Sequence, residues 1–331
     1  MDTPILKNHW ERFKAHVDLD ITTAAQLLAP YTCDIIDKLD LLSEGCANTN
    51  YKVTFKNNRL PVVIRIYMRE KSALPREIAL HQLVADKIPV PAHLYSNDQC
   101  IDYAYPYTVM EWIDGTLMRE IILNKNKEAI IACAYEAGLY LNIMRQIQFS
   151  HGGFFENGLT IRPFNDEEKY LPYVLNMLKD KIVKESLGDN LLNTVLCLVN
   201  DNAALLPDEN GANLTHADYD PANILVKQID GKWKIAAILD WEFAFAGSYL
   251  LDIGMALRYS HKIPDYYENS FIAGIQTNGF QLPAKWKKQA KLMDLLCLLQ
   301  LAHYNPVTER PKLNRDVVSL IGDTVSNWDF F

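Results

Sequence analysis

The sequence has no pattern of cysteines that would bind a structural metal or build a disulfide framework. Structural zinc sites use closely spaced cysteine pairs, and small secreted domains use regularly spaced cysteines. No C-x-x-C pair occurs here, and no cysteine lies in a histidine-rich cluster. The six cysteines are widely scattered, at Cys33, Cys46, Cys100, Cys133, Cys197 and Cys297. We therefore expect no structural zinc site. We expect the thiols to be reduced, which is typical of a cytoplasmic protein.

Long apolar runs are also missing. No stretch approaches the about 18 apolar residues that a membrane-spanning helix requires. The first 20 residues include Lys7, Glu11, Arg12, Lys14 and Asp18, so they lack the unbroken apolar core of a signal peptide. The sequence thus predicts a cytoplasmic location and no membrane partner.

Positive charge is in deficit: 33 Lys and Arg face 41 Asp and Glu, for a net charge of -8 at pH 7. Nucleic-acid binding rewards basic surfaces, so we expect no nucleic-acid partner. An acidic cleft would suit a cationic substrate, although the need for solubility explains the charge more simply. The 331 residues, 49% of them hydrophobic, are long for one domain and suit two lobes separated by a cleft.

The first third of the chain is predicted to be rich in strands. Apolar alternation and β-branched residues predict strands, whereas a 3.6-residue apolar stripe predicts a helix. Short helices are expected at 4–18 and 22–30, strands at 34–44, 50–55, 61–67 and 106–112, and a helix at 72–86. A turn at Asp114–Gly115 is the expected lobe boundary, which gives a first lobe at 1–113, with N-terminal helices in 1–30, and a second lobe at 114–331.

Helical patterns dominate beyond that boundary. Helices are expected at 125–147, 187–206, 252–260, 264–276, 284–303 and 311–327, with one hairpin at 224–239. The predicted fold class is therefore α+β, with a small antiparallel sheet in the first lobe and a large, mostly helical second lobe.

One short loop has the residues that phosphoryl transfer needs. Residues 216–223 read H-A-D-Y-D-P-A-N and lead directly into an apolar strand. Phosphoryl transfer needs a carboxylate for the acceptor hydroxyl, and an amide and a second carboxylate to hold Mg²⁺ against the nucleotide phosphates. Asp218 and Asn223 supply the first two, and the hairpin would return Asp240 beside Asn223.

These two segments, H-A-D-Y-D-P-A-N-I-L-V and I-L-D-W-E, resemble the aminoglycoside phosphotransferase family, to which choline kinases and macrolide phosphotransferases are related. The resemblance covers roughly residues 33–275 and implies a bilobal, protein-kinase-like fold. It implies that the lobe at 1–113 binds the nucleotide and that the lobe at 114–331 is catalytic and binds the acceptor. It implies that Asp218 is the catalytic base and that Asn223 and Asp240 are Mg²⁺ ligands. It also implies that His216 and Asp252 support the catalytic loop.

The nucleotide side departs further from the family pattern. The segment 45–50 stands where the family has its phosphate-covering loop, but it contains a single glycine, so a plain hairpin turn is an equal alternative. Asn48 and Thr49 are its candidate phosphate contacts. Arg65 replaces the usual Lys on the third strand, and Glu77 is its expected partner, with solvent-facing positions for both as the alternative.

The remaining candidates concern the adenine and the acceptor. The resemblance places the adenine hinge at 110–113, with Met110, Glu111 and Ile113 as candidates. Residues near the loop that could bind the acceptor are Tyr219, Asp220, Glu242 and Arg258. Acidic side chains among them would suit an amine-bearing acceptor.

The predicted activity is transfer of a phosphoryl group from ATP or GTP, with Mg²⁺, to a hydroxyl of a small polar molecule, with cationic molecules among the candidates. Antibiotic resistance is one expectation from the family, and a metabolic kinase of the choline or amino-sugar type is the alternative. A catalytically idle nucleotide binder is a further alternative. The absence of D-F-G and A-P-E segments argues against a protein kinase. The sequence leaves the acceptor, the choice of ATP or GTP, and the oligomeric state open.

Overall fold

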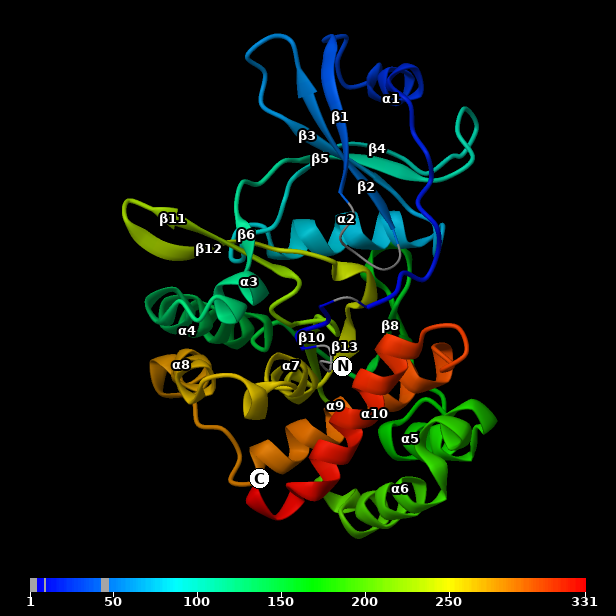
Figure 1. Cartoon of the computed structure of the whole chain (residues 1–331), viewed down its shortest axis with the longest axis vertical. Coiled ribbons are helices and arrows are strands. Elements are labelled where there is room, and N and C mark those ends of the chain that lie inside the picture. The colour runs from blue at the N-terminus through cyan, green and yellow to red at the C-terminus, as the bar shows by residue number, and fades with distance from the viewer. Residues whose placement is uncertain (1–4, 9, 43–47) are drawn as a thin grey trace.

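A twisted antiparallel sheet forms the smaller of two lobes in the computed structural model, which describes residues 5–8, 10–42 and 48–331. Its strand order is β1-β2-β3-β5-β4 (Figure 1). The strands are β1 (Ile36–Leu42), β2 (Thr49–Phe55), β3 (Val62–Ile66), β4 (His93–Asn97) and β5 (Tyr107–Glu111). Residues of β2 alternate between buried and half-buried positions, as the period of a strand with one covered face requires.

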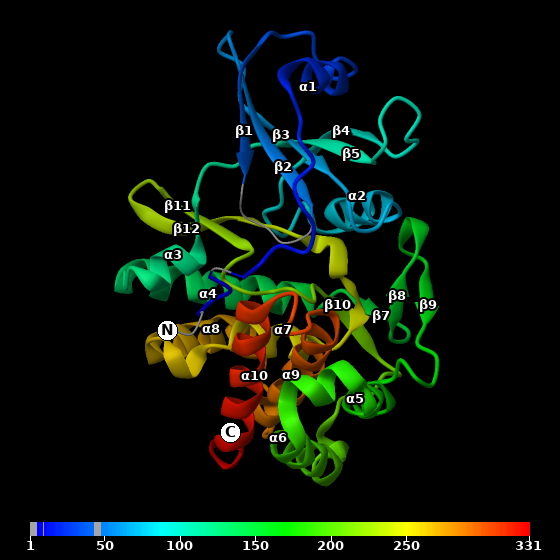
Figure 2. The same cartoon turned by 45° about the vertical axis from the view of Figure 1, so that its right-hand side comes forward.

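Two helices cover this sheet from different sides. Helix α1 (Ile21–Leu28) begins at Asp20, whose side chain accepts a hydrogen bond from Thr23 N, and it packs Leu27 and Leu28 against the sheet. Helix α2 (Ala73–Val84) lies between the sheet and the large lobe in both views (Figures 1 and 2). Its Leu80 and Val84 belong to the core of the large lobe, so α2 joins the two lobes by apolar contact.

The large lobe is mainly helical, as expected. Its helices are α3 (Met118–Leu123), α4 (Lys127–Met144), α5 (Tyr170–Lys179), α6 (Lys181–Asp201), α7 (Tyr249–Ala256), α8 (Asp265–Ile275), α9 (Trp286–Tyr304) and α10 (Pro311–Ser326). Helix α9 passes through the centre and carries buried residues on several faces. A helix buried all round is typical of the core of a large lobe.

A three-stranded sheet of order β12-β11-β6 connects the lobe boundary to the catalytic loop. It contains β6 (Thr116–Leu117), β11 (Ile224–Ile229) and β12 (Lys232–Ile238). A Cβ on Gly115 would lie 2.9 Å from Val226 O, so a glycine is needed for this close approach. The expected boundary between residues 113 and 114 lies in the connector between β5 and β6.

A further sheet of order β7-β10-β13-β8-β9 lies in the large lobe. Its short strands are β7 (Gln148–Phe149), β8 (Gly153–Phe155), β9 (Ile161–Pro163), β10 (Ala212–Thr215) and β13 (Phe245–Gly247). Strand β10 leads into the loop at 216, and β13 follows the segment at Asp240. The sheet thus places the two chemical segments of the sequence side by side.

Most predicted elements are confirmed, and the helix expected at 4–18 is wrong. Among the described residues of that stretch no helix occurs, and Leu6 and Lys7 have left-handed backbone angles, with φ of 54° and 59°. Its side chains bond individually to both lobes, which replaces the regular bonding of a helix. The strand β4, helix α5 and the five short strands of the large lobe were not predicted.

Helix α6 begins six residues before its predicted start at 187. Asp180 is its N-cap and accepts hydrogen bonds from Ile182 N and Val183 N. Gly188, with φ of 69°, interrupts the helix near the predicted start, because glycine adopts this conformation without strain. Within the described part of the chain, no helix combines the length and apolar character needed to cross a bilayer.

Candidate functional site

One buried carboxylate binds the backbone at the start of the loop at 216–223. Asp252, on α7, accepts hydrogen bonds from His216 N at 2.8 Å and from Ala217 N at 2.9 Å. Ala217 has a φ of 63°, a conformation that costs an alanine about 1–2 kcal/mol. Burial raises the pKa of Asp252 to about 7, against the two N–H donors, which lower it. This geometry matches the support role expected for Asp252.

His216 connects the loop to the end of β12. Its Nδ1 lies 3.2 Å from Asp218 N, and its Nε2 lies 2.9 Å from Leu239 O. A backbone N–H can only donate and a carbonyl can only accept, so the bonding requires the neutral tautomer with hydrogen on Nε2. Burial lowers the pKa of His216 to about 4, which keeps that neutral form at pH 7. The position agrees with the bracing role predicted for His216.

Asn223 lies against Asp218. Its Nδ2 donates to Asp218 Oδ2 at 2.6 Å and to Asp218 O at 2.9 Å. Its own carbonyl accepts a bond from Leu239 N at 2.8 Å, which places Asn223 beside the residue that precedes Asp240. The hairpin therefore brings these three predicted residues together.

Asp240 connects the large lobe to the small one. It has left-handed backbone angles, φ 60° and ψ 59°, which turn the chain sharply after β12. Arg65, on β3, donates from Nη1 to Asp240 Oδ1 at 2.5 Å, and its Nη2 lies 3.7 Å from Glu77 Oε2. Burial alone would lower the pKa of Arg65, but Glu77 and Asp240 outweigh it and raise the pKa.

Arg65 is therefore a buried residue of the cleft and does not face solvent from the sheet. Only 6% of Arg65 is exposed. Its guanidinium carbon lies 5.3 Å from the centroid of the Tyr67 ring. Its Nε and Nη2 have no hydrogen-bond partner among the described residues. Buried donors of this kind are unusual, and a guanidinium with donors to spare fits a phosphate group.

Asn48 and Thr49, the phosphate candidates of the segment 45–50, are buried and bonded; residues 45–47 lie outside the described ones. Asn48 donates from Nδ2 to Glu242 Oε2 at 3.0 Å and accepts from Met68 N at 3.2 Å. Thr49 accepts from Val17 N at 3.1 Å through its hydroxyl. Glu242 is thus tied to the small lobe, and burial raises its pKa to about 7.

The hinge candidates lie at and just after the end of β5. Met110 is buried, Glu111 is exposed and Ile113 is half-buried. Met110 pairs in register with Val63, on β3, and Glu111 pairs with Val62. The segment is therefore attached to the strand that carries Arg65.

The four acceptor candidates differ in where their side chains lie. Tyr219 is fully buried and donates its hydroxyl to Ala137 O at 2.8 Å, inside the helical core. Arg258 is also buried and donates from Nε and Nη2 to Asp294 Oδ1 at 2.9 and 2.6 Å. These two placements contradict a direct acceptor role, because neither side chain is presented to a ligand. Glu242 is bonded to Asn48. Of the four candidates, Asp220 is the one that shares Lys7 with Asp218.

Lys7 is a residue of this site that the sequence analysis missed. Its Nζ lies 2.6 Å from Asp218 Oδ1 and also forms an ion pair with Asp220 Oδ2. Burial would raise the pKa of Asp218, but Lys7 outweighs it and lowers the pKa. Burial raises the pKa of Asp220, although Lys7 opposes this rise. Position 7 lies 211 residues from Asp218, and no sequence signal connects the two.

The donor atoms suit Mg²⁺ better than a structural metal. Mg²⁺ commonly uses one or two protein oxygens, with water and phosphate completing its shell. Asn223 turns its amide nitrogen toward Asp218, so its oxygen is the atom left for a cation, and Asp240 can offer its second carboxylate oxygen. Among the described residues, no three His, Cys, Asp or Glu side chains converge as a closed metal site would require.

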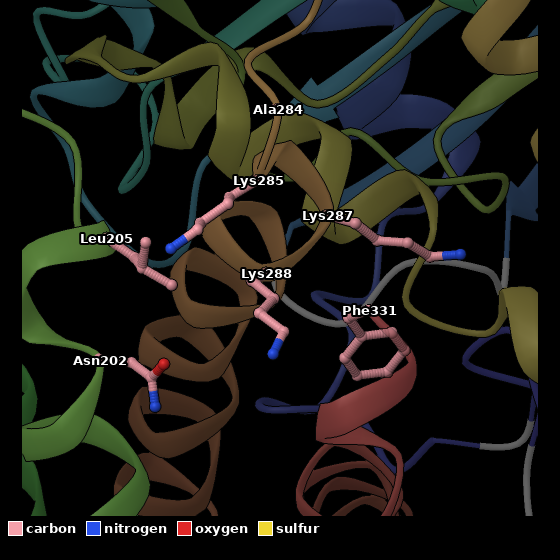
Figure 3. Close-up of a pocket in the computed structure, with 7 residues that line it drawn as sticks. All are labelled: Asn202, Leu205, Ala284, Lys285, Lys287, Lys288 and Phe331. Carbon is pink, nitrogen blue, oxygen red and sulfur yellow. The ribbon is translucent and has the colours of Figure 1, made fainter.

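A separate hollow in the large lobe is unrelated to this cluster. Figure 3 shows its lining residues, which are Asn202, Leu205, Ala284, Lys285, Lys287, Lys288 and Phe331. Lys287 is paired with Glu268 at 2.6 Å, and Lys288 lies over the Trp328 ring. None of the lining residues comes from the loop at 216–223, so the hollow supplies no group to the chemistry there.

Comparison with solved structures shows the same fold in aminoglycoside phosphotransferases. Aminoglycoside phosphotransferase APH(4)-Ia is 15% identical, with a TM-score of 0.67 over 92% of this chain and 98% of the other. The GDP complex of wild-type aminoglycoside 2'-phosphotransferase-IIIa is 13% identical, with a TM-score of 0.69 over 93% and 99%. The kinase-like bilobal fold expected from the sequence is confirmed.

A third similar structure is a thermostable mutant of APH(4)-Ia in a ternary complex with AMP-PNP and hygromycin B. It is 14% identical, with a TM-score of 0.64 over 91% of this chain and 98% of the other. No curated protein sequence matches the chain. The family model described as "Phosphotransferase enzyme family" matches residues 38–287, which is most of the chain. The chain therefore belongs to this phosphotransferase family.

Proposed function

We propose that the protein transfers the γ-phosphoryl group of ATP or GTP to a hydroxyl of a small polar molecule. The observation that carries this proposal is the cluster of Asp218, Asn223, Asp240 and Arg65, joined by hydrogen bonds of 2.5 and 2.6 Å. A carboxylate, an amide oxygen, a second carboxylate and a guanidinium are the groups that phosphoryl transfer requires. The nucleotide complexes among the similar structures, with GDP and AMP-PNP, support a nucleotide co-substrate.

Each residue has a distinct proposed task. Asp218 accepts the proton of the acceptor hydroxyl. At the same time the acceptor oxygen forms a bond to the γ-phosphorus, and the bond between the γ-phosphorus and the oxygen that links it to the β-phosphate breaks. In the structure, Lys7 lowers the pKa of Asp218, so its carboxyl group is ionised there. Asn223 and Asp240 would hold Mg²⁺, which neutralises charge on the phosphates when bound. Arg65 would bind the phosphates, and Glu77 would orient Arg65.

Two further segments are proposed to contact the nucleotide. Asn48 and Thr49 are proposed to border the phosphates, since Asn48 is bonded to Glu242, only two residues from Asp240. The backbone at 110–113 is proposed to receive the purine base, because β5 pairs directly with the strand of Arg65.

The proposed acceptor is small, polar and amine-bearing. Asp220 is buried beside Asp218 and is already paired with an ammonium group, that of Lys7. Similar structures contain hygromycin B, kanamycin and gentamicin, which supports an aminoglycoside-like acceptor. A metabolic kinase for choline or an amino sugar is the second candidate, and the same carboxylate favours it equally.

The test compares the wild type with Asp218→Asn, which keeps the size of the side chain and removes its basicity. Mg²⁺-nucleotide binding is measured by calorimetry, and transfer is measured against aminoglycosides, macrolides, choline and amino sugars. Loss of the base should lower kcat by about 10²–10⁴-fold with little change in nucleotide Kd. Asp189→Asn, at an exposed position of α6, is the matched control and should behave as the wild type.

Three results would contradict the proposal. A wild type that binds no nucleotide in the presence of Mg²⁺ would remove its basis. Transfer that is equally fast in Asp218→Asn would show that Asp218 is not the base. Nucleotide binding that persists unchanged with all Mg²⁺ chelated, and without turnover, would favour the catalytically idle alternative.

A further inference from the structure

The N-terminal segment of the chain runs between the two lobes. We name residues 5–8 and 10–19 the N-terminal strap. In Figures 1 and 2 it descends from α1, passes the small lobe and ends beside the catalytic loop, near α10. Leu6, at its far end, is buried in the core of the large lobe, although the sequence assigned it to the small lobe.

The strap is bound to the large lobe through α10. Glu11 accepts hydrogen bonds from Lys312 N and Leu313 N at 2.9 and 3.0 Å, and so caps that helix. Trp10 Nε1 donates to Asp316 Oδ2 at 2.9 Å. These contacts fix the strap against the N-terminal half of α10.

The strap is bound to the small lobe at a different point. Lys14 donates to Met68 O at 2.8 Å, and Val17 N donates to Thr49 Oγ1 at 3.1 Å. The hydroxyl of Tyr51 donates to Val17 O at 3.0 Å. A segment attached to both lobes resists any change in their separation.

At the end of the strap, Lys7 inserts into the catalytic loop. Its side chain is 13% exposed, and its ammonium is shared by Asp218 and Asp220. Leu6 and Lys7 both have positive φ, which costs about 1–2 kcal/mol for each non-glycine residue. The local backbone is therefore held in this conformation by its contacts.

Lys7 occupies the position that an acceptor hydroxyl needs. A general base must lie within about 2.6–3.2 Å of the group whose proton it accepts. Asp218 Oδ1 is bonded to Lys7, and Oδ2 is bonded to Asn223. The ammonium of Lys7 and an acceptor hydroxyl would therefore compete for Asp218 Oδ1.

We propose that the N-terminal strap is an autoinhibitory element, in which Lys7 occupies the acceptor site and must withdraw before transfer. This proposal rests on the proposed function of Asp218. The protein exists in a strap-closed form, which the structure shows, and a strap-open form, which is competent. The rate is then reduced by the fraction of open molecules.

The experiment uses the full chain and two variants that act at different points. Lys7→Met removes the ammonium and keeps most of the side-chain volume. Glu11→Ala releases the strap from α10 and touches neither Asp218 nor Asp220. Lys56→Met, at an exposed position after β2, is the control. Thermal denaturation confirms that each variant is folded.

Two readouts are measured. The first is hydrolysis of Mg·ATP and Mg·GTP, with water as the acceptor, which avoids any need to know the natural acceptor. The second is the rate at which acetic anhydride acylates Lys7, measured by mass spectrometry with Lys38 as the internal reference. The second readout needs no catalysis, so it separates failure of this proposal from failure of the proposed function.

We expect Lys7→Met and Glu11→Ala each to raise the hydrolysis rate by about tenfold, a typical size for conformational coupling. Acylation of Lys7 should be slow in the wild type and faster in Glu11→Ala by a similar factor. If both variants are slower than the wild type, Lys7 takes part in catalysis and the proposal is overturned. If Lys7 is acylated in the wild type as fast as Lys38, the strap does not close the site, and the proposal is also overturned. If no protein hydrolyses nucleotide, only the proposed function fails, and slow acylation of Lys7 still supports the closed strap.

Discussion

His81 makes the stability of this protein sensitive to acid, and the size of the effect can be worked from its surroundings. The residue lies on α2 and is 5% exposed. Its Nδ1 lies 3.1 Å from Pro91 O, so the neutral ring carries its hydrogen there. Its Nε2 is 3.8 Å from Glu77 Oε1, and the ring of His93 is 4.7 Å away. A proton added to Nε2 would place a charge in this buried cluster.

Burial lowers the pKa of His81 from 6.5 to about 4, and the nearby Arg65 acts in the same direction. The hydrogen bond to Pro91 opposes the decrease. Below pH 6.5 the unfolded chain binds a proton that the folded chain does not bind. Stability is therefore complete above pH 6.5 and is lost as the pH falls toward 4. One pKa unit corresponds to about 1.4 kcal/mol, so the loss at pH 4 is about 3 kcal/mol.

The assay is urea denaturation of the wild type and His81→Gln between pH 7 and pH 4. Glutamine does not titrate, and its amide can still donate to Pro91 O. Asp252 and Glu242, with pKa values raised to about 7 by burial, stabilise the fold as the pH falls. They are common to both proteins, so the difference between the two proteins isolates His81 and the share of His93 that depends on it. Parallel pH profiles would refute the reasoning, as would an imidazole resonance of His81 that titrates near pH 6.5.

Two further predictions concern packing and the support of the loop. Gly138→Ala should lower the free energy of unfolding by about 1–3 kcal/mol, because its Cβ would lie 2.0 Å from Phe271 O, on the adjacent helix α8. Gly322→Ala, with nothing within 4 Å of the added Cβ, should be neutral or stabilising by up to about 1 kcal/mol, and equal effects in thermal denaturation would contradict this. Asp252→Asn leaves one of the N–H groups of the loop, such as that of Ala217, without an acceptor, so kcat should fall by about tenfold or more with nucleotide Kd unchanged in calorimetry. An unchanged kcat would show that the loop holds its shape without this carboxylate.

The parts of the fold that the sequence predicted well depend on local patterns. β-branched residues in β3 and alternation in β2 identify strands, because side-chain burial on one face of a sheet repeats every two residues. The short strands β7 to β10 and β13 have two to four residues each, too few for a period to show. They exist because the large lobe pairs them, which no local window can reveal.

The direction of side chains in the loop could not be predicted from spacing. Asp218 and Asn223 lie together because residues 216–223 turn tightly, and a motif of fixed length describes such a turn well. Tyr219 lies between two residues of the site yet points into the core, toward Ala137 O. Arg258 is drawn away by Asp294, which is 36 residues further along the chain. Both outcomes depend on partners that the loop sequence does not contain.

The strap was mispredicted because its contacts are distant in sequence. Residues 4–18, which include several charged side chains, were predicted to form a short helix. In the structure those charges have fixed partners, such as Asp218 for Lys7 and the first turn of α10 for Glu11. Contacts between residues more than 200 positions apart leave no trace in a local pattern, so position 7 could not be connected with the catalytic loop.

Asp218, the proposed base, and Asp240, a proposed metal ligand, have different partners, and this difference bears on how the proposed site could be controlled. Asp218 is positioned wholly within the large lobe, by His216 and Asn223. Asp240 is also paired with Arg65, so its environment depends on the small lobe. Movement of the small lobe would therefore act on Asp240 through Arg65 and on Asp218 through the strap. The strap acts directly on the base through Lys7. If the proposed roles hold, two controls would act on one cluster: lobe closure through Arg65, and acceptor access through Lys7.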